Sequence, residues 1–192
     1  MKDTFQFYNV GDPNTGQVLG NPVRIEKVVA DKPGGALISD PGFDVFETTA
    51  VGRNADGARF DVIKGYRLVA AVAVSDTTIK IAKGSGIVVG DFLGYGTLAV
   101  KSTALDQTND SYDLVTITMG IAIASGEVLY QAAAASASAA QVIETPLYIL
   151  GSPVRGGFGD QEASLIAVGT VRKETCCIGK DVAALLVTIK LV

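Results

Sequence analysis

Residues that could do chemistry are sparse in this chain, and a glycine-rich stretch is the first to consider. The stretch KGSGIVVGDFL, residues 83–93, has glycines that could cradle a phosphate group. A phosphate cradle needs a helix N-terminus directly after the glycines, because the helix amides hold the anion. Here GYG at 94–96 interrupts the chain again. The glycines therefore predict turns between short strands, with no phosphate or dinucleotide bound.

A polar loop at 103–113 holds the largest group of candidate metal ligands. Asp106, Asn109, Asp110 and Asp113 lie close together there. Calcium prefers such oxygen ligands, but the spacing is not that of an EF-hand. Polar loops are also rich in Asp and Asn because these side chains cap turns. The favoured interpretation is an ordinary loop without a metal, and a calcium site is the alternative.

The two cysteines are adjacent, at Cys176 and Cys177. Neighbouring residues of a strand point to opposite faces, so one thiol is expected to face a core. A structural disulfide is not expected, and two sulfurs without histidine do not form a zinc site. The nearby GKD at 179–181 lacks the upstream glycine and the Ser/Thr of a P-loop, so it predicts a turn.

The absence of histidine bears on catalysis. It removes the commonest general base, the usual triads and nearly all zinc sites. Asp44 and Glu47 could act as an acid–base pair, but no cleft residues accompany them, so a solvated face is expected. We predict no enzyme, no catalytic residue and no cofactor. A lyase that uses Tyr and Lys is the remaining enzymatic alternative.

Composition narrows the range of partners. The 192 residues are 48% hydrophobic and only 19% charged, with a net charge of −4. No run of Lys or Arg exceeds two residues, so nucleic-acid binding is not expected. The longest aliphatic run, LVAAVAV at 68–74, is far too short to span a bilayer. The first ten residues do not read as a secretion signal, which predicts synthesis in a cytoplasm and no membrane partner.

Short strands separated by turns must position these groups. Residues 22–30 and 43–51 each read as a strand, and residues 77–130 read as several short strands separated by turns and a polar loop. GSPVRGGFGD, 151–160, reads as a glycine-rich loop, and the last residues alternate as a strand within a sheet. This spacing predicts a mainly β fold, with one or more small β-barrel or sandwich modules. The low-complexity stretch QAAAASASAAQ, 131–141, predicts one short Ala-rich helix, because Ala is the best helix former. A flexible connector is the alternative there.

Three parts follow from this pattern. Residues 1–65 are expected to be an extended and strand-forming region, and residues 66–141 a small barrel-like module that includes the Ala-rich helix. Residues 142–192 are expected to be a β segment that packs on the module.

Phe5, Phe7 and Tyr8 are bulky residues near the terminus. They predict either an arm that docks on a partner or a first strand within the chain's own sheet.

One stretch resembles a known family. TIKIAKGSGIVVGDFL, 78–93, combines alternating Ile and Lys with a K-x-G-x-x-V-G-D-F pattern. This is similar to a module of the head-fibre and capsid-decorating proteins of tailed bacteriophages, including phages of gut Bacteroidales. The stretches VTITMGIAIASGEVLYQA, 115–132, and GTVRKETCCIGKDVAALLVTIKLV, 169–192, are similar to later parts of the same module. The resemblance covers residues 70–192, and the N-terminal third departs from it.

The resemblance implies a non-enzymatic structural protein on the outer surface of a phage head. Its expected partners are the major capsid protein or other head proteins, and further copies of itself, as a trimer in preference to a dimer. On this hypothesis Phe5, Phe7 and Tyr8 dock on the capsid. The alternative is a module of the same particle that binds host-surface glycan. Its candidate sugar-stacking residues are Phe92, Tyr95, Tyr112 and Tyr130.

Overall fold

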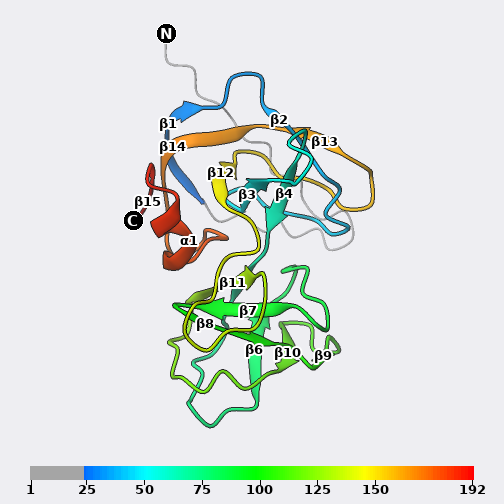
Figure 1. The fold of residues 1–192 in the computed structure, drawn as a ribbon, viewed down its shortest axis with the longest axis vertical. Coiled ribbons are helices and arrows are strands. Elements are labelled where there is room, and N and C mark those ends of the chain that lie inside the picture. Colours follow the sequence, from blue (N-terminus) through cyan, green and yellow to red (C-terminus); the bar gives the residue numbers. More distant parts are fainter. Residues whose placement is uncertain (1–23) are drawn as a thin grey trace.

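A computed structural model describes residues 24–192 and shows a mainly β protein, as the sequence predicts. Its strands fall into two groups, the larger lobe and the smaller lobe, which lie one above the other in Figure 1. The proposed docking residues Phe5, Phe7 and Tyr8 lie outside the described residues. Within the described part, no helix is long and apolar enough to cross a membrane.

The larger lobe combines the first and last parts of the described chain. Its elements are β1 (Ile25–Asp31), β2 (Ala36–Ile38), β3 (Ala50–Arg53), β4 (Phe60–Ile63), β12 (Pro146–Leu150), β13 (Gln161–Ala163), β14 (Leu165–Val171), α1 (Lys180–Leu185) and β15 (Ile189–Leu191). All eight strands belong to one sheet, in the order β1-β14-β12-β3-β4-β2-β13, with β15 parallel to β14. The predicted C-terminal strand is thus confirmed.

This sheet curls into a barrel-like shape. Strands β13 and β14 are separated by a single residue, Ser164, yet they pair at different places along the sheet. Strand β1 pairs with β14, and β2 pairs with β13, so both chain segments bend together. The buried face of the sheet holds aliphatic side chains such as Ile38, Val51 and Leu165. Burial of these side chains away from water favours the curled shape.

The smaller lobe is a continuous stretch of chain. Its elements are β5 (Gly65–Arg67), β6 (Thr78–Ala82), β7 (Phe92–Tyr95), β8 (Leu98–Lys101), β9 (Ala104–Asp106), β10 (Tyr112–Thr116) and β11 (Val128–Ala132). They form two sheets, β5-β11-β7-β8 and β6-β10-β9, around a separate apolar core. In β6 the buried Ile79 and Ile81 alternate with exposed Lys80, as the sequence predicts for this strand.

The chain enters and leaves the smaller lobe at one point. The backbone N–H of Gln131 donates to the carbonyl of Lys64 at 3.0 Å, and the Gln131 side chain accepts from the Lys64 N–H. The residues expected as separate N-terminal and C-terminal parts therefore meet in one sheet, as far as the structure describes them. The smaller lobe is an insertion between them.

Residues 131–141 do not form the expected helix, and the one helix of residues 24–192 is α1. The ends of the tract pair with each other through Ala132 and Val142. Its middle pairs with the outer edge of β8, where Ser136 and Ala99 exchange two backbone hydrogen bonds of 2.8 and 2.9 Å. Local helix propensity is a weak preference, and these tertiary hydrogen bonds override it. We call residues 133–141 the alanine loop.

Candidate interaction surfaces

The glycines of residues 83–93 form turns, which confirms that prediction. Gly84, Gly86 and Gly90 have positive φ angles that suit glycine. The carboxylate of Asp91 is held within the protein, where it accepts from the Tyr66 hydroxyl at 2.8 Å and the Lys64 ammonium at 3.0 Å. Burial, and then the Asp91 charge, raise the pKa of Tyr66. This stretch therefore fixes the point where the chain enters the smaller lobe, and it presents no cradle.

The polar loop 103–113 is held by its own contacts. Asp113 is buried and pairs with the Lys83 ammonium at 2.7 Å, while Asp106 accepts from both the N–H and the hydroxyl of Thr108. Asn109 caps the N–H of Ser111. Among the described residues, no three Asp, Glu, Cys or His side chains are grouped to hold a metal ion. The calcium alternative gains no support from this arrangement.

The remaining polar candidates also contact other residues of the protein and stabilise its fold. Asp44 accepts from the Gly156 N–H at 3.1 Å, whereas Glu47 pairs with Arg24 at 3.0 Å. Both cysteines are free thiols. Cys176 is buried, as expected for one of the pair, and burial raises its pKa. The GKD stretch, 179–181, is the start of α1 instead of the expected turn.

The aromatic residues considered for glycan stacking are engaged within the protein. Ammonium groups lie over three of the rings: Lys101 over Phe92, Lys180 over Tyr95 and Lys80 over Tyr112, at 4.3 to 5.9 Å from the centroids. Tyr130 is buried and donates to the Gly96 carbonyl at 2.9 Å. A sugar would have to displace these contacts before it could stack.

A different aromatic residue, Phe158, stands out on the surface. Its side chain is 74% exposed, at the tip of residues 155–160, which we call the Phe158 loop. The carboxylate of Asp40 accepts backbone hydrogen bonds from Gly157 and Gly159, both at 2.9 Å, and a third from Gly42. These three N–H groups lower the pKa of Asp40. The loop is therefore held by a carboxylate that lies 117 and 119 residues away in the chain from the two loop amides it binds.

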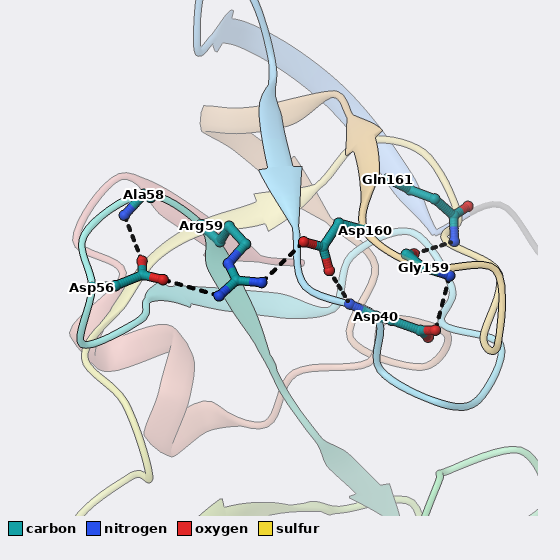
Figure 2. A network of polar contacts seen from close by, with 7 residues as sticks. All are labelled: Asp40, Asp56, Ala58, Arg59, Gly159, Asp160 and Gln161. Carbon is teal, nitrogen blue, oxygen red and sulfur yellow. Dashed lines mark hydrogen bonds and ion pairs between the residues drawn. The ribbon is translucent and has the colours of Figure 1, made fainter.

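Further contacts fix the base of the Phe158 loop, and Figure 2 shows those that Asp160 makes with Asp40 and Arg59. Asp160 accepts from the backbone N–H of Asp40 and pairs with Arg59, which also pairs with Asp56; both ion pairs measure 3.0 Å. The Gln161 side chain bonds the backbone of Arg155 in both directions. Every one of these contacts is made by the base or the backbone of the loop, so the Phe158 ring stays free.

Glycine is required inside this loop for steric reasons. A Cβ atom at Gly156 would overlap the backbone of Phe43, so only glycine allows the loop to approach so closely. Gly157 and Gly159 flank Phe158 and contribute no side chains of their own. The Phe158 ring is thus a narrow apolar projection on a fixed base.

A second exposed surface lies on β1. Six of its seven residues are exposed, and they include the adjacent Val28 and Val29, which we call the β1 valine surface. The strand pairs with β14 on one side and has several register shifts. Such bulges and the charged neighbours Glu26 and Lys27 oppose the addition of another strand to this edge. A partner would therefore contact the valine side chains instead of the backbone.

The third surface is a groove of about 580 Å³ beside α1, which we call the α1 groove. Its walls come from both lobes and from the chain that links them. The main lining residues are Tyr130, Val142, Glu144, Pro146, Asp181 and Leu185. Leu185 and the nearby Val187 are exposed, the latter at 88%. Apolar walls with carboxylates at intervals favour an apolar partner that carries positive charge.

Comparisons of the chain with protein-family models, with characterised proteins and with solved structures find no match. The three surfaces therefore stand on their geometry alone.

Sequence reasoning predicted a loop at 151–160 but not the exposure of Phe158. The signal that could have found it is the aromatic residue between glycines in RGGFGD. The Asp40 contact could not be found this way, because nothing local connects residues 40 and 159. The α1 groove was also missed, since its walls come from three distant parts of the chain.

Proposed function

We propose that this chain is a structural protein of a phage head, carried on the outer surface of the capsid and bound to the major capsid protein. The observation that supports the proposal best is the β1 valine surface. Val28 and Val29 are adjacent on an edge strand, and both are exposed. Two adjacent exposed valines on a fixed strand suit contact with a partner protein rather than chemistry on a small substrate.

The position of β1 in the chain adds to this argument. The strand begins at Ile25, directly after the N-terminal residues that include Phe5, Phe7 and Tyr8. We propose that these aromatic residues and the β1 valine surface both contact the capsid. A stable protein contact buries about 1,600 Å², and repetition around a capsid multiplies even a modest affinity.

The resemblance of residues 70–192 to head-fibre and capsid-decorating proteins gives the same function. In this role the protein acts by burying apolar surface against a regular lattice. The role requires no catalytic group, cofactor or metal.

The proposal is tested on particles of the phage that encodes the chain. Antibodies raised against the purified protein should label the outside of intact heads in electron microscopy. The purified chain should also co-sediment, at fixed stoichiometry, with heads from which it has been stripped. The variant Val28→Asp/Val29→Asp should lose at least about tenfold in that binding, since charges replace buried apolar groups.

The matched control is Val88→Asp/Val89→Asp, an equally exposed pair of adjacent valines on the smaller lobe. It should bind heads as the unmodified chain does. Absence of the protein from purified virions would refute the proposal. Equal loss in both variants would refute the assignment of the contact to β1.

A further inference from the structure

We propose that Phe158 of one copy inserts into the α1 groove of a second copy, so that the chains associate head to tail. This contact is separate from the β1 valine surface and does not depend on the capsid role. Three features support it: the rigid Phe158 loop, the size and walls of the groove, and complementary charges beside them.

The Phe158 loop has the properties of an interface anchor. A side chain that is already ordered before binding loses little conformational entropy when it is buried. The Asp40 and Asp160 contacts order this loop in the isolated chain. Aromatic residues dominate the binding energy of protein interfaces when they fill a pocket in the partner.

The α1 groove matches such an anchor in size and polarity. Its volume of about 580 Å³ lies in the range of cavities that hold compact apolar groups. Val142, Pro146 and Leu185 supply apolar walls. In the isolated chain Leu185 is 53% exposed, so an inserted ring would cover surface that is otherwise in contact with water.

The charges beside the two surfaces are opposite in sign. Glu144 lines the groove, is partly buried, and has no hydrogen bond or ion pair with any residue that the structure describes. Arg155 lies three residues before Phe158, and its guanidinium is likewise without a partner in the described part of the chain. Insertion of Phe158 would bring Arg155 to the rim of the groove, where it can pair with Glu144.

The contact must form between copies. In Figure 1 the loop that leads into β13 and helix α1 lie on opposite sides of the larger lobe. One chain therefore cannot place Phe158 in its own groove. Because the two surfaces differ, the contact is heterologous and generates a closed ring or an open filament. A ring of few copies fits the oligomer expected for this protein.

Sedimentation of the purified full chain over a concentration series provides the first test. The unmodified chain should associate, and Phe158→Ser should weaken that association by about tenfold or more. Leu185→Arg should do the same by blocking the groove. Val74→Ser, which changes an equally exposed residue of the smaller lobe, is the control and should associate normally. Circular dichroism verifies that each variant is folded.

Mixing distinguishes this contact from other modes of association. Phe158→Ser retains an intact groove, and Leu185→Arg retains an intact Phe158 loop. Each variant should be monomeric alone, and an equimolar mixture should form a 1:1 dimer that grows no further. Arg155→Glu and Glu144→Arg should each weaken association, and a chain that carries both changes should recover it.

Several results would overturn the proposal. They are an unmodified chain that stays monomeric, a Phe158→Ser variant that associates normally, and a mixture of the two variants that forms no dimer. Association that depends on residues 1–23 but not on Phe158 would assign the contact to the N-terminal residues instead. A chain that associates as proposed but does not bind heads would leave this contact intact and refute only the capsid role.

Discussion

The two lobes of this protein are built from β-strands in opposite ways. The smaller lobe folds from one continuous stretch, and even its most distant strand pair, β5 with β11, joins residues within that stretch, Gly65 and Tyr130. The larger lobe joins strands from residues 25–63 to strands from residues 146–191, so its sheet cannot close until both ends of the chain are present. Local pairing is entropically cheaper than long-range pairing. We therefore infer that the smaller lobe forms first.

The lobes also differ in what they present to a partner. The Phe158 loop and the β1 valine surface belong to the larger lobe, and α1 forms one side of the groove. Each of these features depends on contacts between distant residues, such as Asp40 with Gly159. The proposed contact surfaces are therefore located mainly in the larger lobe, whose sheet depends on pairing between distant parts of the chain.

The largest expected effect comes from breaking the junction between the lobes. A Cβ atom at Gly65, in β5 of the smaller lobe, would overlap the carbonyl oxygen of Cys177 in the larger lobe. Gly65→Ala should therefore lower the free energy of unfolding by on the order of 3 kcal/mol, because Gly65 cannot move without breaking its pairing with Tyr130 of β11, and Cys177 cannot move without losing its hydrogen bond to Thr48. Calorimetry should show the single transition of the unmodified chain split into two.

Gly120→Ala provides the control for this experiment. Gly120 has a positive φ but open space around it, so the change should cost only about 1 kcal/mol of backbone strain. A Gly65→Ala variant that unfolds in one transition at an unchanged temperature would show that the lobes are not coupled through this contact.

Alkaline pH should sharpen the comparison, because both lobes bury groups that ionise only at high pH. Burial raises the pKa of Tyr66 in the smaller lobe and of Cys176 in the larger lobe. Both groups ionise more readily in the unfolded chain. Their contribution to stability is therefore complete below the unfolded pKa, about 8.5 for Cys and 10 for Tyr, and is lost as pH rises.

Urea denaturation between pH 8 and pH 11 measures this effect. Stability should fall by up to about 1.4 kcal/mol per pH unit for each ionising group. Cys176→Ala should flatten the fall that begins near pH 8.5, and Tyr66→Phe the fall that begins near pH 10. At neutral pH, Tyr66→Phe should cost about 1–2 kcal/mol, since it loses a hydrogen bond to the Asp91 carboxylate. Identical pH profiles for all three proteins would contradict this account.

The smallest expected effect is local to the Phe158 loop. The pKa of Asp40 is lowered by its backbone hydrogen bonds, so its contribution is present above the usual carboxyl pKa near 4 and is lost as pH falls through the lowered value. Asp40→Asn should mimic the acid state at neutral pH. Hydrogen exchange of the Gly157 and Gly159 amides should accelerate, with little change in the melting temperature.

Asp106→Asn supplies the matched control in the smaller lobe. Asp106 also binds a backbone N–H, but that of Thr108, only two residues away. Its loss should leave amide exchange in the Phe158 loop unchanged. Unaltered exchange of Gly157 and Gly159 in Asp40→Asn would show that the carboxylate does not hold the loop.

The sequence predicted what depends on local pattern and failed where distant contacts decide. Alternation in TIKIA correctly predicted a strand, and the glycines after it correctly predicted turns. The Ala-rich tract was predicted as a helix because helix propensity is a local property. The pairing of this tract with Ala99 is a long-range contact, which the local pattern does not reveal. Helix α1 was missed because six residues are too few to establish a helical period.

The candidate contact surfaces also divide into features that the local sequence indicates and features that only distant contacts create. The glycine content of RGGFGD indicated a loop, but its partner Asp40 lies more than a hundred residues away in sequence. Nothing in the local pattern could pair them. Likewise Glu144 and Leu185 are unremarkable in sequence and become part of one groove only through the fold.

The alanine loop has a consequence for solubility. Strand β8 lies at the end of its sheet, and its outer edge would otherwise offer unpaired backbone groups to any other chain. Ser136 and Ala140 satisfy some of these groups from within the same molecule, through hydrogen bonds to Ala99 and Thr97. Exposed sheet edges nucleate aggregation when many copies accumulate in one place. The small side chains of this loop let it lie close against the strand, so this edge of the sheet is closed to stacking against another chain.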